Sequence, residues 1–178
     1  MNWRHIPLFI FVTLVTYLIH EAGHWAMGEF LGYDMWVNIN SAGLARGEYS
    51  AEWHGQLVSA AGPLITLAQA VIAFLIVRKR KSIIAFAFLF AALMMRFVAM
   101  VVSLNNPNDE ARVSEWLGLG PWTLYLLVVA TLLGLTIKGG SYLKWGWRSY
   151  ALAYLTISIG LAAVVMGEGF IPRFNPYS

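Results

Sequence analysis

The sequence contains no cysteine and few charged residues. Without cysteine, disulfides and thiolate metal ligands are excluded, so any bound metal must be held by His, Asp or Glu. Only 12% of the 178 residues are charged, 59% are hydrophobic, and the mean hydropathy is +0.64. This composition is typical of a polytopic membrane protein. The net charge of +3 is small and clustered, so we expect no nucleic-acid partner.

Long linkers, internal repeats and low-complexity tracts are also lacking, so we predict one membrane-embedded domain over residues 1–178. The predicted fold is an all-α polytopic membrane protein with about five transmembrane helices, at residues 6–31, 52–77, 82–104, 121–137 and 147–167. A small β-hairpin is expected between the first two helices. The first apolar run, preceded by Arg4, resembles a signal anchor and is too long for a cleaved signal peptide.

The first apolar run carries the motif HEAGH at residues 20–24. On a helix, His20 and His24 project from one face, a spacing that suits two ligands of one Zn²⁺ at about 2.0–2.1 Å. Glu21 could then act as general base on a water activated by the metal. Each ionisable residue in a membrane helix costs about 2.5–3.5 kcal/mol on insertion scales. The motif therefore predicts metal binding, with a structural polar cluster as the alternative.

Residues 32–53 are polar and do not span the membrane. Apolar and polar residues alternate over residues 35–40, which is typical of a half-buried strand. We expect a turn at residues 41–43 and a returning strand at residues 44–49. The hairpin could pair through an edge with an extended substrate, or it could be a plain connector. The candidate substrate-binding residues are Trp36, Val37, Asn38 and Ile39.

A second polar segment follows the third predicted helix. Asn106 can cap a short helix with Pro107 at its first position, which puts Asp109 in the first turn, where a carboxylate favours the helix dipole. The ends of helices one and three and the start of helix two meet at one membrane face, so Asp109 can reach the two histidines. Competing acids and ligands for that site are Glu48, Glu52, His54 and Glu110.

Arg96 lies deep in the third predicted helix, about 12 Å from its C-terminal end, close to the depth of His24. A charge at this depth needs a partner or a water-filled cavity. Three roles are open: an ion pair with Glu29 or Asp109, a catalytic role stabilising an oxyanion in the cavity, or snorkelling to the interface.

These pieces together resemble the site-2 protease family of intramembrane zinc metallopeptidases. The resemblance covers residues 6–117 and is carried by HEAGH, by AAGPL at residues 60–64 and by NNPND at residues 105–109. It implies His20, His24 and Asp109 as Zn²⁺ ligands, Glu21 as base, and a membrane-spanning protein as substrate. In the family the aspartate usually precedes glycine, whereas Glu110 follows it here. The helices at residues 121–137 and 147–167 match no family motif, and no PDZ-like insertion is seen.

The positive charges predict the orientation. Most of them lie on the side of the N-terminus, which favours a cytoplasmic N-terminus, in the cell membrane of a prokaryote. This distribution of positive charges puts the end of the first helix that carries the histidines on the non-cytoplasmic side. The resemblance instead implies a site that faces the cytosol. Two non-proteolytic alternatives are a membrane scaffold with a structural or regulatory metal and a metal transporter. The intact Glu21 argues against the first, and the single ligand cluster argues against the second.

Overall fold

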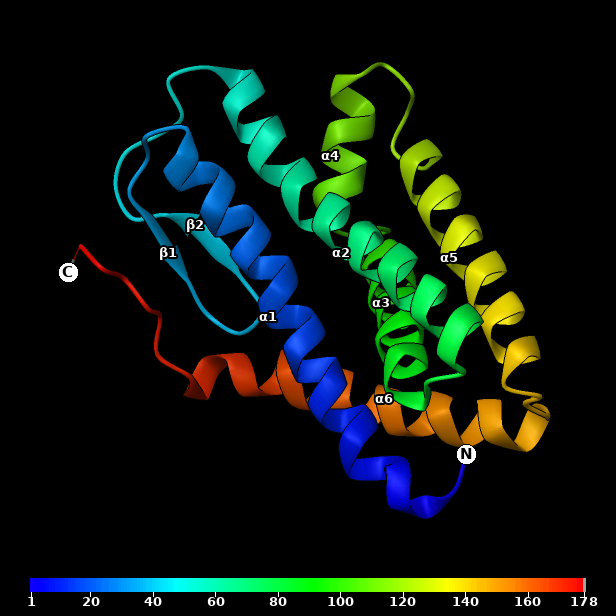
Figure 1. Cartoon of the computed structure of the whole chain (residues 1–178). Helices are drawn as coiled ribbons and strands as arrows, with labels where there is room; N and C mark the ends of the chain where they lie inside the picture. Colours follow the sequence, from blue (N-terminus) through cyan, green and yellow to red (C-terminus); the bar gives the residue numbers. More distant parts are fainter. Residues whose placement is uncertain (178) are drawn as a thin grey trace.

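A computed structural model of the chain, which describes residues 1–177, is a helical bundle with one small sheet (Figure 1). The elements in chain order are a 3₁₀ turn Trp3–His5, α1 Ile6–Phe30, β1 Met35–Val37, β2 Ala42–Leu44, α2 Glu52–Arg80, α3 Ile83–Val102, α4 Asp109–Trp116, α5 Thr123–Tyr142, α6 Trp147–Gly167 and a 3₁₀ turn Glu168–Phe170. Five helices in the described chain, α1, α2, α3, α5 and α6, are long and apolar enough to span a membrane. The predicted all-α polytopic fold with a small hairpin between the first two helices is confirmed.

Helix α3 lies at the centre of the bundle, in contact with α1, α2, α5 and α6 (Figure 1). Its alanines let the neighbouring helices approach closely, and Phe86, Leu89 and Phe90 fill the remaining space. Large apolar side chains such as Ile72 of α2 and Leu126 of α5 point outward and stay exposed. That distribution suits lipid around the bundle, and the protein is an integral membrane protein by the length and composition of its helices.

Helix α6 crosses α1 and α3 at a steep angle (Figure 1). The crossing with α1 is at Gly160, where an added Cβ would stand 3.0 Å from Cβ of Thr13. The connection before α6 begins later than expected, because Gly139 and Gly140 belong to α5. Both glycines are buried, and a Cβ on Gly140 would overlap the hydroxyl of Tyr150, so the two residues serve helix packing and not a loop.

Two local predictions are wrong. The hairpin turn lies at residues 38–41, before the expected position, because the Asn38 side chain accepts a hydrogen bond from the Asn40 amide at 2.9 Å and closes an Asx turn. Ala42 and Gly43 therefore belong to β2, paired with Val37 and Trp36. Asn106 does not cap α4; Asn108 precedes its first residue instead, with its amide held by Ser103 Oγ at 3.1 Å.

The α1–α6 crossing predicts a matched pair of variants. Gly160→Leu should overpack the crossing and destabilise the bundle by about 1–3 kcal/mol, because Cβ of Thr13 cannot move aside as a flexible side chain could. Gly134→Leu on α5, where an added Cβ meets nothing within 4 Å, is the control. Thermal unfolding in detergent should show a lower midpoint for Gly160→Leu alone; equal midpoints would contradict this packing.

Candidate metal centre

His20 and His24 lie on the buried face of α1, where α1 packs against α2. The helices approach closely because glycines face the contact. A Cβ on Gly62 would stand 2.3 Å from Nε2 of His24 and 2.6 Å from Cε1 of His20. A Cβ on Gly23 would stand 2.8 Å from the Ile65 side chain. Glycine at position 62 therefore leaves the space that both imidazole rings occupy.

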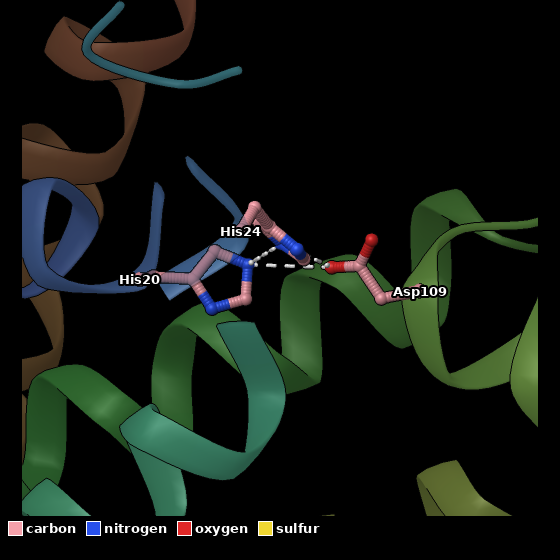
Figure 2. Close-up of side chains that lie close together, drawn as sticks. All are labelled: His20, His24 and Asp109. Carbon is pink, nitrogen blue, oxygen red and sulfur yellow. Dashed lines mark hydrogen bonds and ion pairs between the residues drawn. The ribbon is translucent and has the colours of Figure 1, made fainter. Parts of the chain in front are cut away.

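The two imidazoles meet the carboxylate of Asp109, which begins α4, and the three groups point toward one another (Figure 2). The two Nε2 atoms are 3.1 Å apart, and Oδ2 of Asp109 is 3.3 Å from each of them. A tetrahedral ion with bonds of about 2.0–2.1 Å holds its ligand atoms about 3.3–3.4 Å apart. The spacing of the three atoms fits three corners of such a site, and the group could hold a metal ion.

The outer nitrogens of both rings are occupied by hydrogen bonds that fix the tautomers. His24 Nδ1 lies 2.6 Å from the carbonyl of Val58, so this nitrogen carries the proton and donates it. His20 Nδ1 lies 3.0 Å from Thr66 Oγ1, whose own proton goes to the carbonyl of Gly62. Such partners orient metal-binding histidines. In the neutral rings the facing Nε2 atoms therefore carry no proton, so two nitrogen acceptors and one carboxylate oxygen face one another.

The orientation of the Asp109 carboxylate is fixed by a contact to Oδ1, the oxygen that does not face the histidines. The Arg112 guanidinium, three residues along α4, donates to Oδ1 at 2.9 Å, so Oδ2 is left facing the histidines. Two guanidinium groups lie beside this carboxyl, Arg112 at 2.9 Å and Arg96 at 3.6 Å, and both favour its ionised form. Asp109 is therefore a carboxylate, the form that binds metals.

Arg96 of α3 lies beside the same group and is 4% exposed. Its Nη1 donates to both carboxylate oxygens of Glu110, at 3.2 and 3.1 Å, and lies 3.6 Å from Asp109 Oδ2. Its Nη2 lies 3.4 Å from Nε2 of His20. Of the two expected partners, Asp109 is confirmed at 3.6 Å. Pairing with Glu29 is wrong, because Glu29 accepts from the Met35 amide and from the Tyr177 hydroxyl, away from this site. The shorter of the two ion pairs of Arg96 is with Glu110.

A cavity of about 510 Å³ lies against these residues. Glu21, adjacent to His20 on α1 and 6% exposed, lines it together with His20, His24 and Asp109. Further polar groups come from several elements: Tyr17, Asn40, Ser41, Ser59, Arg96, Asn108 and Arg112. The lining thus combines metal-ligand types, a carboxylate that can exchange protons, and groups that can hold water.

The structure separates the candidate ligands. His20, His24 and Asp109 are the His/Asp/Glu group in the described chain whose ligand atoms converge. Of the competitors, His54 hydrogen-bonds Tyr33 at 2.6 Å, and Glu110 pairs with Arg96. Glu48 and Glu52 lie outside the converging group and do not line the cavity.

The candidate substrate-binding residues Trp36, Val37, Asn38 and Ile39 do not line the cavity, whereas the next residues, Asn40, Ser41 and Ala42, do. Three of the four instead contact the segment that follows α6: Val37 pairs with Phe174, Trp36 lies under Arg173, and Asn38 donates to Glu168.

Several supporting residues were missed by sequence reasoning. Arg112 carried a usable signal, because residues three apart on a helix are neighbours and Asp109 opens that helix. Glu110 was named as a competing ligand and Arg96 as a buried charge that needs a partner, but their pairing with each other was not predicted. Thr66 and the carbonyl of Val58 gave no signal, since their role depends on how α2 packs against α1.

The hydrogen bond between Thr66 and His20 can be tested. Thr66→Val keeps the side-chain shape but removes the acceptor, so divalent-metal affinity should fall about 10–100-fold. Thr136→Val is the matched control, because the Thr136 hydroxyl is also buried but finds no hydrogen-bond partner within residues 1–177. Competition titration with a metal-binding dye measures both. Equal affinities of the two variants would show that Thr66 does not orient a ligand.

Comparison with known proteins finds no matching family model, no matching curated protein and no matching solved structure. The likeness to the site-2 protease family therefore rests on the three sequence motifs. In the structure, residues of all three motifs lie together: HEAGH on α1, Gly62 of AAGPL against both imidazoles, and Asp109 of NNPND facing them.

Proposed function

We propose that the protein is an intramembrane zinc metallopeptidase, similar to site-2 proteases, that hydrolyses a peptide bond within or next to a substrate transmembrane helix. The observation that carries the proposal is the convergence of three bare ligand atoms at tetrahedral spacing on a cavity that also holds Glu21. His20, His24 and Asp109 would hold the metal. Two histidines and one carboxylate are a common ligand set of catalytic zinc.

A zinc ion bound there would supply a Lewis acid that activates water near neutral pH and polarises the scissile carbonyl. Glu21 takes the proton of the attacking water and delivers it to the departing amine. Thr66 and the Val58 carbonyl keep the imidazoles in the tautomer that leaves Nε2 free, and Arg112 keeps Oδ2 of Asp109 turned inward. The polar lining of the cavity provides places for water beside these groups.

Substrate and orientation follow from the setting of the site. The cavity lies among helices that can span a membrane, so a membrane-spanning protein is the expected substrate, and its helix must unwind locally to expose a peptide bond. We place the N-terminus in the cytoplasm of a prokaryotic cell, on the positive-inside rule. The site then opens toward the other face, opposite to the family expectation.

Arg96 serves first as a structural tie to Glu110, and its Nη2 near His20 also puts a donor at the edge of the site. A donor placed beside the reacting carbonyl can stabilise the oxyanion that forms during attack. The two roles are compatible, because the carboxylate of Glu110 holds one guanidinium nitrogen while the other faces the ligand group.

Glu21→Gln tests the proposed chemistry. The variant should keep stoichiometric zinc, because Glu21 is not among the converging ligand atoms, and it should lose detectable cleavage of a model membrane substrate, because the amide cannot accept the proton. His20→Ala should lose both metal and cleavage. Zinc content by mass spectrometry and a gel-based cleavage assay are the measurements. Full cleavage by Glu21→Gln would overturn the assignment of the base, and a metal-loaded wild type without cleavage would favour the scaffold alternative.

The Arg96–Glu110 pair gives a second test. Arg96→Met alone leaves Glu110 charged and buried, which should cost about 3–5 kcal/mol of stability. Arg96→Met combined with Glu110→Leu removes both charges and should recover most of the loss. If Arg96 also stabilises the oxyanion, the recovered double variant should still turn over about a hundredfold more slowly or worse. Near-normal turnover in the stable double variant would limit Arg96 to the structural role.

A further inference from the structure

The segment that follows α6 does not leave the molecule but turns back along the hairpin (Figure 1). Phe174 exchanges two backbone hydrogen bonds with Val37, the Val37 amide donating at 3.0 Å and the Phe174 amide at 2.8 Å. β2 pairs with one edge of β1, and Phe174 forms an antiparallel bridge to the opposite edge, which we call the outer edge of β1. The two-stranded hairpin is thus extended by a single bridge from a segment more than 130 residues later in the sequence.

Both outward amides of β1 are occupied. In an antiparallel strand, successive residues direct their backbone groups to opposite edges, so Met35 and Val37 face the outer edge together. The Val37 amide binds Phe174, and the Met35 amide donates to the Glu29 carboxylate at 2.9 Å. That carboxylate also accepts from the hydroxyl of Tyr177. The segment therefore follows β1 for the length of the strand.

Side chains fasten the segment at both ends. At its start, Glu168 accepts from Asn38 at 3.3 Å, from Asn40 at 2.9 Å and from the Ser41 hydroxyl, all in the hairpin turn. Arg173 lies over the Trp36 ring, 4.1 Å from its centroid. Because Asn40 and Ser41 also line the cavity, the start of the segment at Glu168 contacts residues of the cavity wall.

We propose that the outer edge of β1 is a docking edge for an extended peptide, and that residues 171–177 are its built-in occupant, which a substrate must displace. Strand addition uses backbone hydrogen bonds that any extended peptide can form, so an unwound substrate and this segment compete for the same groups. The backbone pairing of the occupant is limited: one of its residues, Phe174, bridges to the strand, and that residue is 63% exposed. The consequence for cleavage rests on the proposed function, whereas peptide binding does not.

Phe174→Pro and Phe174→Ala separate the backbone contact from the side chain. Proline removes the amide that donates to Val37, whereas alanine keeps it. While residues 171–177 occupy the edge, only a fraction of the protein molecules can bind substrate there. Freeing the edge should therefore reduce the KM for a membrane substrate three- to tenfold without changing kcat. Phe174→Ala should keep the wild-type KM. An unchanged KM in Phe174→Pro, or an equal reduction in both variants, overturns the proposal.

A binding measurement needs no cleavage. A fluorescein-labelled peptide with the sequence of residues 171–177, IPRFNPY, should bind the full-length Phe174→Pro variant about tenfold more tightly than the wild type or Phe174→Ala, as measured by anisotropy in detergent. Hydrogen exchange at the Val37 amide should rise in Phe174→Pro and fall again when the peptide is added. Equal peptide affinity for all three proteins overturns the docking edge. Preferential peptide binding in a protein that cleaves nothing would refute the protease function but retain the edge.

Discussion

The structure depends on the compensation of charge inside a bundle of apolar helices. Arg96 and Glu110 are both nearly inaccessible, and either one alone would be an uncompensated charge in a low-dielectric interior. Asp109 adds a second carboxylate, and Arg112 and Arg96 lie beside it as balancing cations. The first two residues of α4 carry both carboxylates, so this network ties α4 to α3 and α1 as well as to the helices it packs against, α2 and α5.

Close backbone approach makes that network possible. The imidazoles reach Asp109 only because Gly62 leaves room for their rings between α1 and α2. The same contact brings Thr66 and the Val58 carbonyl to the outer nitrogens. Orientation of the ligands and packing of the helices are therefore one structural property, and a change on α2 that fills this space alters both together.

The sequence predicts the helices and the histidine pair well, because run length and a four-residue spacing are local signals. Of the two partners predicted for Arg96, Asp109 is confirmed and Glu29 is wrong, because Glu29 accepts from the Met35 amide. The shorter pairing with Glu110 was not predicted, since it depends on how α4 packs against α2 and α5. The hairpin register depends on an Asx turn at Asn38, which strand alternation does not reveal. The docking of residues 168–177 on β1 joins segments about 130 residues apart and had no sequence signal.

The ligand group also sets an order of events during synthesis. His20 and His24 lie in the first long helix, but Asp109 follows the third, so a chain emerging from the ribosome holds an incomplete site until α1, α2 and α3 have entered the membrane and α4 has been made. The two imidazoles alone offer a metal only two nitrogens. A metal that needs all three groups could therefore bind only after α4 has been made and has packed against the first helices, and a shorter chain would lack the third ligand.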